Sequence, residues 1–201
     1  MYGKLRKTPG WFRMLIPAVC YTAAGFLLKT VLDRSTFIQT GASRQTIETA
    51  VKGIALIVLI SYARKYGISF RVTSRRMVVL CLSAGIILGM ITAGIAEVSG
   101  LLSKAECSFL WICLKCVTGP VLDELIYRGL ILQQAQDIMD EKAAILISSL
   151  LFSAGHGFPQ ALAAFPAGIV FSYAMIKERT IVAPVIIHVT SNIILFVFSC
   201  K

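Results

Sequence analysis

The sequence predicts an all-α integral membrane protein, a bundle of seven or eight transmembrane helices with a buried polar site. Of its 201 residues, 57% are hydrophobic and only 15% are charged, and the mean hydropathy is +0.79. A soluble domain is usually about 45–50% apolar. The apolar residues also form long runs. A helix that crosses a bilayer needs such a run, of about 20 residues. We therefore expect one polytopic membrane domain over residues 1–201.

The net charge of +10 fits either a nucleic-acid-binding protein or a membrane protein with basic loops. Lys and Arg gather at 1–13 and 64–76, in segments that flank apolar runs. Cytoplasmic loops of membrane proteins carry such an excess of basic residues. We therefore expect a lipid bilayer and no nucleic acid as partner, with the N-terminus in the cytoplasm. The run from Met14 to Leu32 lacks a small-x-small cleavage site, which favours an uncleaved first span.

Seven apolar runs are long enough to be helices. They occupy residues 14–32, 48–63, 77–98, 107–136, 143–157, 161–176 and 181–199. The fourth run is either one long helix or two shorter ones, and Pro120 favours a new helix there because proline is tolerated in a first turn. The short fifth and sixth runs meet at "HGFPQ", which indicates a hairpin packed inside the protein. Residues 1–106 then supply N-terminal spans, and 107–199 the motif-bearing core.

Small residues and cysteines add two structural expectations. Gly85 and Gly89 form a GxxxG pattern that Gly94 follows, and we expect these glycines to permit close helix packing. The six cysteines lie in or at the ends of apolar runs, including the CxxC pair Cys113 and Cys116. We interpret them as buried free thiols rather than as a redox or metal site.

Three ionisable residues stand inside the fourth apolar run, in the stretch "GPVLDELIYRGLIL". Glu124 and Arg128 are four residues apart and share a helix face, so they can form an ion pair. Asp123 is rotated by about 100° from Glu124. Each charge costs at least about 2.5 kcal/mol at the centre of a bilayer. Such residues usually mark a functional site, although an ion pair that only fixes helix packing is the alternative.

Two further polar clusters lie in later apolar runs. Phe152 and His156 are one helical turn apart, and so are His188 and Asn192. The chain contains no other histidine. A single intramembrane histidine is often only a hydrogen-bonding partner between helices. Two of them in a chain that also buries a diacid favour one polar site where several helices converge.

These residue types suit the activation of a water molecule. A carboxylate in a poorly hydrated pocket can act as a general base, and an imidazole can hold the water or share its proton. His188 and the amide of Asn192 can donate hydrogen bonds to an oxyanion. Alternatively, His156, His188 and Glu124 are a competent zinc triad with water in the fourth position. The helical zinc-protease motif HExxH is absent, and both mechanisms stay open at this stage.

The three clusters in this order resemble the CPBP family of intramembrane proteases, which includes the CAAX prenyl endopeptidases and the bacterial Abi proteins. The motifs are "DELIYRG" (123–129), "FSAGH" (152–156) and "HVTSN" (188–192). The resemblance covers residues 107–199. It implies an endopeptidase that hydrolyses a peptide bond in a membrane-associated peptide or protein. It also implies the plasma membrane of a bacterium as the location.

The resemblance assigns roles to individual residues. The first acid, Asp123, activates water together with His156. His188 and Asn192 then stabilise the oxyanion, while Glu124 and Arg128 hold the site together or position the substrate. Zinc is a possible cofactor, because the family has been called both a metalloprotease and a glutamic protease family.

One residue departs from the family pattern, in which the first acid is glutamate. Asp123 withdraws the carboxylate by one bond of about 1.5 Å, and a misplacement of about 1 Å can cost a hundredfold in rate. Three outcomes follow: the backbone compensates, Glu124 becomes the base, or the protein is a non-catalytic scaffold that binds a partner. A proton-coupled transporter would also bury Asp, Glu and His, but it predicts an inverted repeat that the sequence lacks.

Overall fold

The computed structural model describes residues 41–65, 67–100, 112–156 and 158–200, with scattered positions between 16 and 30. Within these residues every regular element is a helix. Four helices are long and apolar enough to cross a membrane. The protein is thus an all-helical integral membrane protein. The predicted span 14–32 lies mostly outside the described residues, so the number of seven or eight helices stays a prediction.

The helices follow the predicted apolar runs to within a few residues at most ends. They are α2 (Gly41–Lys65), α3 (Arg75–Val98), α7 (Glu141–Ala154), α8 (Gln160–Glu178) and α9 (Val182–Ser199). Polar caps fix two of the starts. The Ser74 hydroxyl accepts the Met77 amide before α3, and the Asp140 carboxylate accepts the Ala143 amide before α7, which satisfies amides that have no partner inside the helix.

A continuous helix over 112–136 forms the centre of the molecule. It comprises the π-helix η2 (Cys113–Thr118), α5 (Gly119–Glu124), the π-helix η3 (Leu125–Leu132) and α6 (Gln133–Gln136). The predicted new helix at Pro120 is therefore wrong. The preceding turn widens instead, since the Gly119 amide bonds to the Leu114 carbonyl five residues back, and a π-turn accommodates proline without a break.

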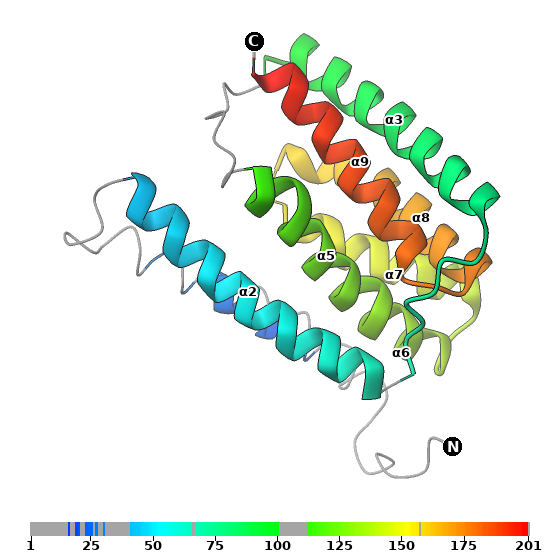
Figure 1. Ribbon diagram of the computed structural model, residues 1–201. Helices are drawn as coiled ribbons and strands as arrows, with labels where there is room; N and C mark the ends of the chain where they lie inside the picture. Colours follow the sequence, from blue (N-terminus) through cyan, green and yellow to red (C-terminus); the bar gives the residue numbers. More distant parts are fainter. Residues whose placement is uncertain are drawn as a thin grey trace.

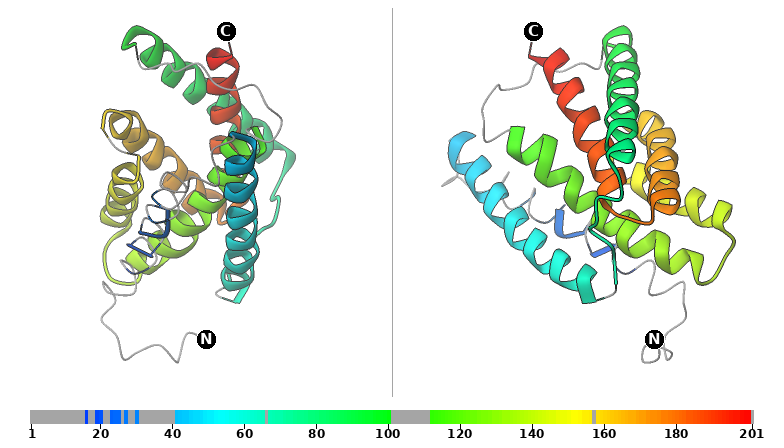
Figure 2. Two further views of the ribbon diagram at one scale, coloured as in Figure 1. Left: turned by 90° about the vertical axis from the view of Figure 1, so that its left-hand side faces the viewer. Right: turned by 45° about the vertical axis from the view of Figure 1, so that its right-hand side comes forward.

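The other helices pack around this central helix. Figures 1 and 2 show α2, the central helix, α9 and α3 side by side in that order. The central helix contacts α2, α7, α8 and α9, whereas α3 packs chiefly against α9. The diacid thus lies in α5 against α2 and α9, while α7 and α8 pack against η3, which follows it directly.

Helices α3 and α9 approach closely because two glycines lie between them. A Cβ atom added at Gly85 would lie 2.6 Å from the Cβ of Thr190, and one at Gly89 would lie 2.8 Å from the carbonyl of Ser191. The predicted role of these glycines in helix packing is confirmed. It does not extend to Gly94, where an added Cβ meets nothing within 4 Å.

Helices α7 and α8 form the predicted hairpin, but only one face of the hairpin is buried. Leu146 and Leu150 on α7, and Leu162 and Tyr173 on α8, are exposed. Because α8 is long enough to cross a membrane, the expectation of two short helices enclosed by protein is wrong for α8. The exposed apolar side chains suit contact with lipid.

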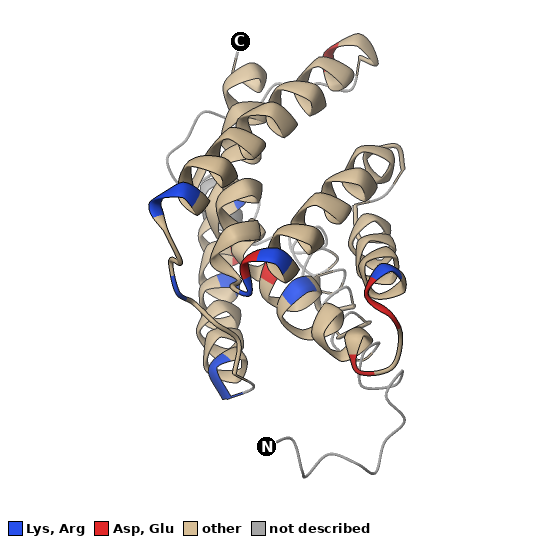
Figure 3. Cartoon of the chain, turned by 90° about the vertical axis from the view of Figure 1, so that its right-hand side faces the viewer, with Lys and Arg blue, Asp and Glu red and all other residues tan. Residues whose placement is uncertain are grey.

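The segment 67–74 joins the end of α2 to the start of α3 and is bonded to the turn between α8 and α9. Its Ser69 carbonyl accepts hydrogen bonds from the Ile181 amide at 3.0 Å and the Thr180 hydroxyl at 3.1 Å. Figure 3 shows Lys and Arg mostly at helix ends and connections, with the helices themselves largely uncharged. This distribution is typical of a protein whose helices cross a bilayer.

The interpretation of the cysteines as buried free thiols is confirmed for only some of those that the structure describes. Cys20 is free but exposed, and Cys107 lies outside the described residues. Cys81, Cys113 and Cys116 are free, and Cys81 and Cys116 are buried. Cys200, just beyond the end of α9, is disulfide-bonded, so the interpretation is wrong for that residue.

Candidate active site

Three side chains meet at the centre of the site: Glu124, Arg128 and His188, which we call the buried triad. The Glu124 Oε1 atom accepts hydrogen bonds from Arg128 Nη1 at 3.2 Å and from His188 Nδ1 at 2.7 Å. The predicted pairing of Glu124 with Arg128 is confirmed. Glu124 and Arg128 are fully buried and His188 is nearly so. The triad links the central helix to α9.

Arg128 connects the triad to α7 and α8. Its Nη2 atom donates to the Gly168 carbonyl at 3.0 Å. Its guanidinium carbon lies 4.4 Å from the centre of the Phe152 ring and 5.1 Å from that of Phe171. A buried cation is tolerated only when charge and hydrogen bonds compensate the lost hydration, and aromatic faces add cation–π attraction. Phe152 of the second motif therefore helps to hold Arg128 in place.

The His188 imidazole is held in one orientation. It stacks on Phe171 at 4.7 Å with an interplanar angle of 20°, and it meets Phe152 edge-on at 5.6 Å. An ionised carboxylate can only accept a hydrogen bond, so the Nδ1 atom beside Glu124 carries a proton. The Nε2 atom is then the one through which His188 can act on a substrate.

Asp123 occupies a different environment from its neighbour Glu124. It is half-buried, and its carboxylate interacts electrostatically with Lys52, Tyr127 and Arg128. Lys52 comes from α2 and was not among the residues that the motifs singled out. Its position as a lone lysine within an apolar run could have identified it, because ionisable residues inside a membrane usually serve a function.

His156 lies at the end of α7 and is exposed. Its Nδ1 atom is 2.9 Å from the Phe152 carbonyl, so Nδ1 donates and Nε2 keeps its lone pair. Tyr127, one turn after Asp123, contacts the Phe152 ring at 5.4 Å, and its hydroxyl is 3.1 Å from where a Cβ on Gly155 would lie. Tyr127 therefore connects Asp123 to the segment that carries His156. The motifs alone gave no reason to select Tyr127.

Asn192 is positioned by the π-turn that precedes Pro120. The Lys115 carbonyl would pair with the amide of residue 120 in this turn, but proline has no N–H. The Asn192 side-chain amide donates to this carbonyl instead, at 3.2 Å. The amide nitrogen carries a second N–H, which can serve another acceptor. Pro120 and Asn192 thus belong to one arrangement, although they lie in different motifs.

The residues proposed as zinc ligands are not arranged as a zinc triad. No group of three His, Cys, Asp or Glu side chains is gathered for a metal within the described parts of the chain. Glu124 and His188 are bonded to each other, whereas the Nδ1 atom of His156 bonds to the Phe152 carbonyl. The donor set as placed does not fit zinc, and we assign no step to a metal.

The predicted site residues thus divide into two groups. Glu124 and Arg128 are closed to solvent and His188 nearly so, and their bonds join the central helix to α8 and α9. The Glu124 Oε2 and Arg128 Nε atoms are buried without a hydrogen-bond partner. Asp123, His156 and Asn192, which we call the open residues, are half-buried or exposed. The triad places bonded charges inside the protein, and the open residues are those that are at least partly exposed.

Comparison with known proteins identifies the family of this segment. Residues 105–194 match the family described as type II CAAX prenyl endopeptidase Rce1-like. No curated protein and no solved structure matches the chain. All three motifs lie within the matched segment, as do the buried triad and the open residues. Residues 105–194 are thus similar to the Rce1-like type II CAAX prenyl endopeptidases, a family of peptidases.

Proposed function

We propose that this protein is an intramembrane endopeptidase that hydrolyses a peptide bond in a membrane-associated peptide or protein. The match of residues 105–194 to a peptidase family supports hydrolysis in general. The observation that carries the proposal is the contrast between Glu124, which is fully buried and bonded to Arg128 and His188, and the adjacent half-buried Asp123. A rigid charged centre beside an accessible acid is suited to water activation.

Asp123 is the general base in this proposal. It takes a proton from a water molecule that the Nε2 atom of His156 holds in place, and the water oxygen attacks the carbonyl carbon of the scissile bond. Asn192 donates a hydrogen bond to the resulting oxyanion. His188 donates through Nε2 in its imidazolium form, which the Glu124 carboxylate stabilises. The proton on Asp123 then passes to the leaving amine as the carbon–nitrogen bond breaks.

Glu124 has a positioning role rather than the role of base. One of its oxygens already accepts two hydrogen bonds, and the side chain is fully buried. A water at Glu124 would have to reach a carboxylate that is closed to solvent. Its bond to His188 instead fixes the ring that faces the oxyanion, as a carboxylate does behind a catalytic histidine.

The orientation in the membrane follows from the basic helix ends. Arg64 and Lys65 end α2, and Arg75 and Arg76 begin α3. We place these ends and the N-terminus in the cytoplasm under the positive-inside rule. The location that we propose is a bacterial plasma membrane.

The proposal is tested by cleavage of a quenched-fluorescence library of hydrophobic peptides by the full chain in lipid nanodiscs. We expect wild-type cleavage that is lost in Asp123→Asn and His156→Ala and kept in Glu97→Gln, an exposed acid at the end of α3. Activity that a chelator abolishes and zinc restores would move the chemistry to a metal. Cleavage that survives Asp123→Asn would refute its role as base, and no cleavage in a folded preparation would favour the scaffold.

A further inference from the structure

Two ionisable residues stand inside the membrane span of α2. Glu48 and Lys52 are the only charged residues of this span before Arg64, and both are half-buried. They are four residues apart and therefore share a helix face. Lys52 continues the half-buried side of α2 that packs against the core, to which Leu56, Leu59 and Ile60 belong. A charge in a membrane span is costly and usually faces the interior of the bundle.

The side of α2 that carries Lys52 packs against the central helix. Helix α2 contacts η2, α5 and η3. The Lys52 ammonium group attracts the carboxylates of Asp123 and Glu48 and is repelled by Lys115 of η2. Lys115 is exposed, whereas Lys52 and Asp123 are half-buried. Because water screens a half-buried pair less than an exposed one, Lys52 acts on Asp123 from a position where charge is effective.

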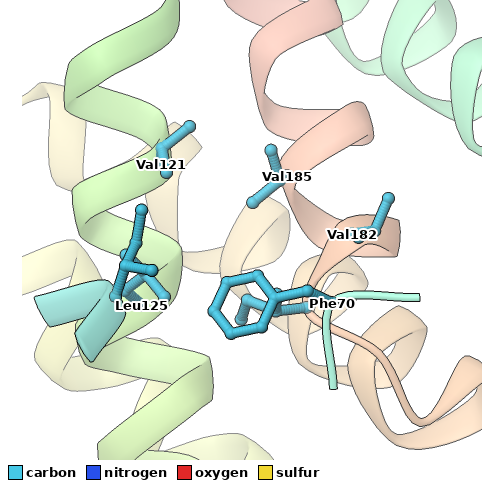
Figure 4. Close-up of a pocket in the computed structure, with 7 residues that line it drawn as sticks. Phe70, Val121, Leu125, Val182 and Val185 are labelled. Carbon is cyan, nitrogen blue, oxygen red and sulfur yellow. The ribbon is translucent and has the colours of Figure 1, made fainter. Parts of the chain in front are cut away.

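Another side of the central helix is apolar. Figure 4 shows Val121 and Leu125 facing Val182 and Val185 of α9 across a cavity of about 170 Å³, and all the residues that line it are apolar. Asp123 lies two residues from both Val121 and Leu125, about 200° around the helix axis. It therefore points away from the cavity. The ionisable groups that act on Asp123 come instead from α2 and from the central helix itself.

Lys52 and Arg128 are both cations near Asp123, but only Arg128 belongs to the buried triad. Arg128 donates to Glu124 and to the Gly168 carbonyl. A change at Lys52 therefore alters the charge beside Asp123 without removing a member of the triad. Residue 52 also lies outside the segment 105–194 that matches the family, so the match assigns it no role.

We propose that Lys52 is a positioning residue of the candidate site, whose ammonium group keeps the Asp123 carboxylate ionised and able to accept a proton from water. The proposal rests on the proposed peptidase function. A general base acts only in its ionised form, and a neighbouring cation favours that form. The other titratable groups around Asp123 and Lys52 are Glu48, Lys115, Glu124, Tyr127, Arg128, His156 and His188.

The first test is the pH dependence of kcat/KM for a peptide that the wild type cleaves. In Lys52→Met the midpoint of the acid side should move to higher pH by about one unit, because a carboxylate without its cation takes up a proton more readily. Lys52→Arg should keep the wild-type midpoint. Lys65→Met, at an exposed lysine that ends the same helix, is the matched control and should not move it.

Glu48→Gln separates this role from an ion pair that only stabilises α2. A purely structural pair responds alike when either partner is removed. In our account Glu48→Gln leaves Lys52 beside Asp123, so it should not move the midpoint to higher pH. An unchanged midpoint in Lys52→Met, or an equal shift in Glu48→Gln, would overturn the proposal. Lys52→Gln is the second variant should Lys52→Met not fold.

A chemical measurement on the full chain in nanodiscs does not depend on cleavage. Dicyclohexylcarbodiimide is a hydrophobic reagent that modifies protonated carboxyl groups, and mass spectrometry locates the modified residue. At neutral pH, Asp123 should be modified about tenfold faster in Lys52→Met than in the wild type or Lys52→Arg, since one pH unit corresponds to a tenfold change in the protonated fraction. If the wild type cleaves no peptide, the proposed function fails and this rate alone decides on Lys52. Equal rates in the wild type and Lys52→Met would refute its role.

Discussion

The buried triad and the open residues come from the same motifs, yet their environments are opposite. Asp123 and Glu124 are adjacent in the sequence, and His156 and His188 are the two histidines of one proposed site. In each pair one member is buried and bonded while the other can be reached from outside. The difference shows that neighbouring members of one predicted site can differ in burial, and in the proposed mechanism the accessible acid performs the chemistry.

Helix geometry produces this division. Successive residues of a helix point about 100° apart, so a diacid cannot direct both carboxylates to the same partner. Glu124 points to α9 and forms its hydrogen bond with His188. His156 differs from His188 because it lies at the end of α7 rather than within a helix. Four predictions separate the two groups by their effect on the free energy of unfolding, from the largest effect to the smallest.

Arg128→Met should have the largest effect, a loss of about 3–5 kcal/mol, because it leaves the Glu124 carboxylate buried without its cation. Unfolding in SDS or by heat measures this loss. Arg64→Met, at an exposed position, is the matched control and should change stability by less than about 0.5 kcal/mol. If Arg128→Met were as stable as this control, the triad would not hold the helices together.

The two histidines should respond differently to the same change. His188→Ala removes a hydrogen bond to a charged group and should cost about 1.5–3 kcal/mol. His156→Ala should leave stability nearly unchanged. Both should lower cleavage by a factor of about 100–10,000 if they share in proton transfer or oxyanion binding. Equal destabilisation by the two substitutions would contradict the division into buried and open residues.

Helix α9 carries His188 and packs against α3. Substitutions in this contact test whether the site depends on that packing. Gly85→Ala and Gly89→Ala should each cost about 1–3 kcal/mol, since the added methyl group meets backbone and branched side chains. Gly94→Ala is the control and should be neutral or slightly stabilising, because alanine favours a helix. Unfolding curves of the three variants measure these changes in the free energy of unfolding. An unchanged stability of Gly85→Ala would refute the close approach of α3 and α9.

Asn192→Ala should have the smallest effect on stability, about 0.5–1.5 kcal/mol for one hydrogen bond to the Lys115 carbonyl. Its effect on cleavage should be larger, about 100-fold or more, if the second N–H serves the oxyanion. Asn192→Asp keeps the size of the side chain but removes both N–H groups, so it should reproduce both losses. A variant with normal cleavage would remove Asn192 from the proposed mechanism.

The sequence predicted most helices well because long apolar runs leave few other structures possible in a membrane. The helices over 75–98 and 182–199 match predicted runs to within two residues. The prediction of a new helix at Pro120 was wrong, because a proline after glycine is compatible both with a new helix and with a π-turn. Whether the π-turn forms depends on Asn192, which donates a hydrogen bond to the Lys115 carbonyl, 77 residues away in the sequence. A local sequence pattern does not contain that information.

The site was predictable in its members but not in its contacts. The spacing of Glu124 and Arg128 within one helix was enough to predict their pairing. Their joint contact with His188 depends on how α9 packs against the central helix, which is set by side chains along both helices. Lys52 belongs to no motif, and Tyr127 is one of the three residues that separate the diacid from Arg128 in the first motif. Both became evident only from their positions near Asp123.

In the proposed mechanism Asp123 performs the chemistry, whereas Glu124 holds the structure. The most direct measurement follows Asp123→Asn and Glu124→Gln in parallel, recording the cleavage rate and the free energy of unfolding of each. We predict that Asp123→Asn loses cleavage by at least about 100-fold with unchanged stability, whereas Glu124→Gln loses both. Cleavage that persists in Asp123→Asn, while a stable Glu124→Gln protein is inactive, would contradict the account and make Glu124 the base.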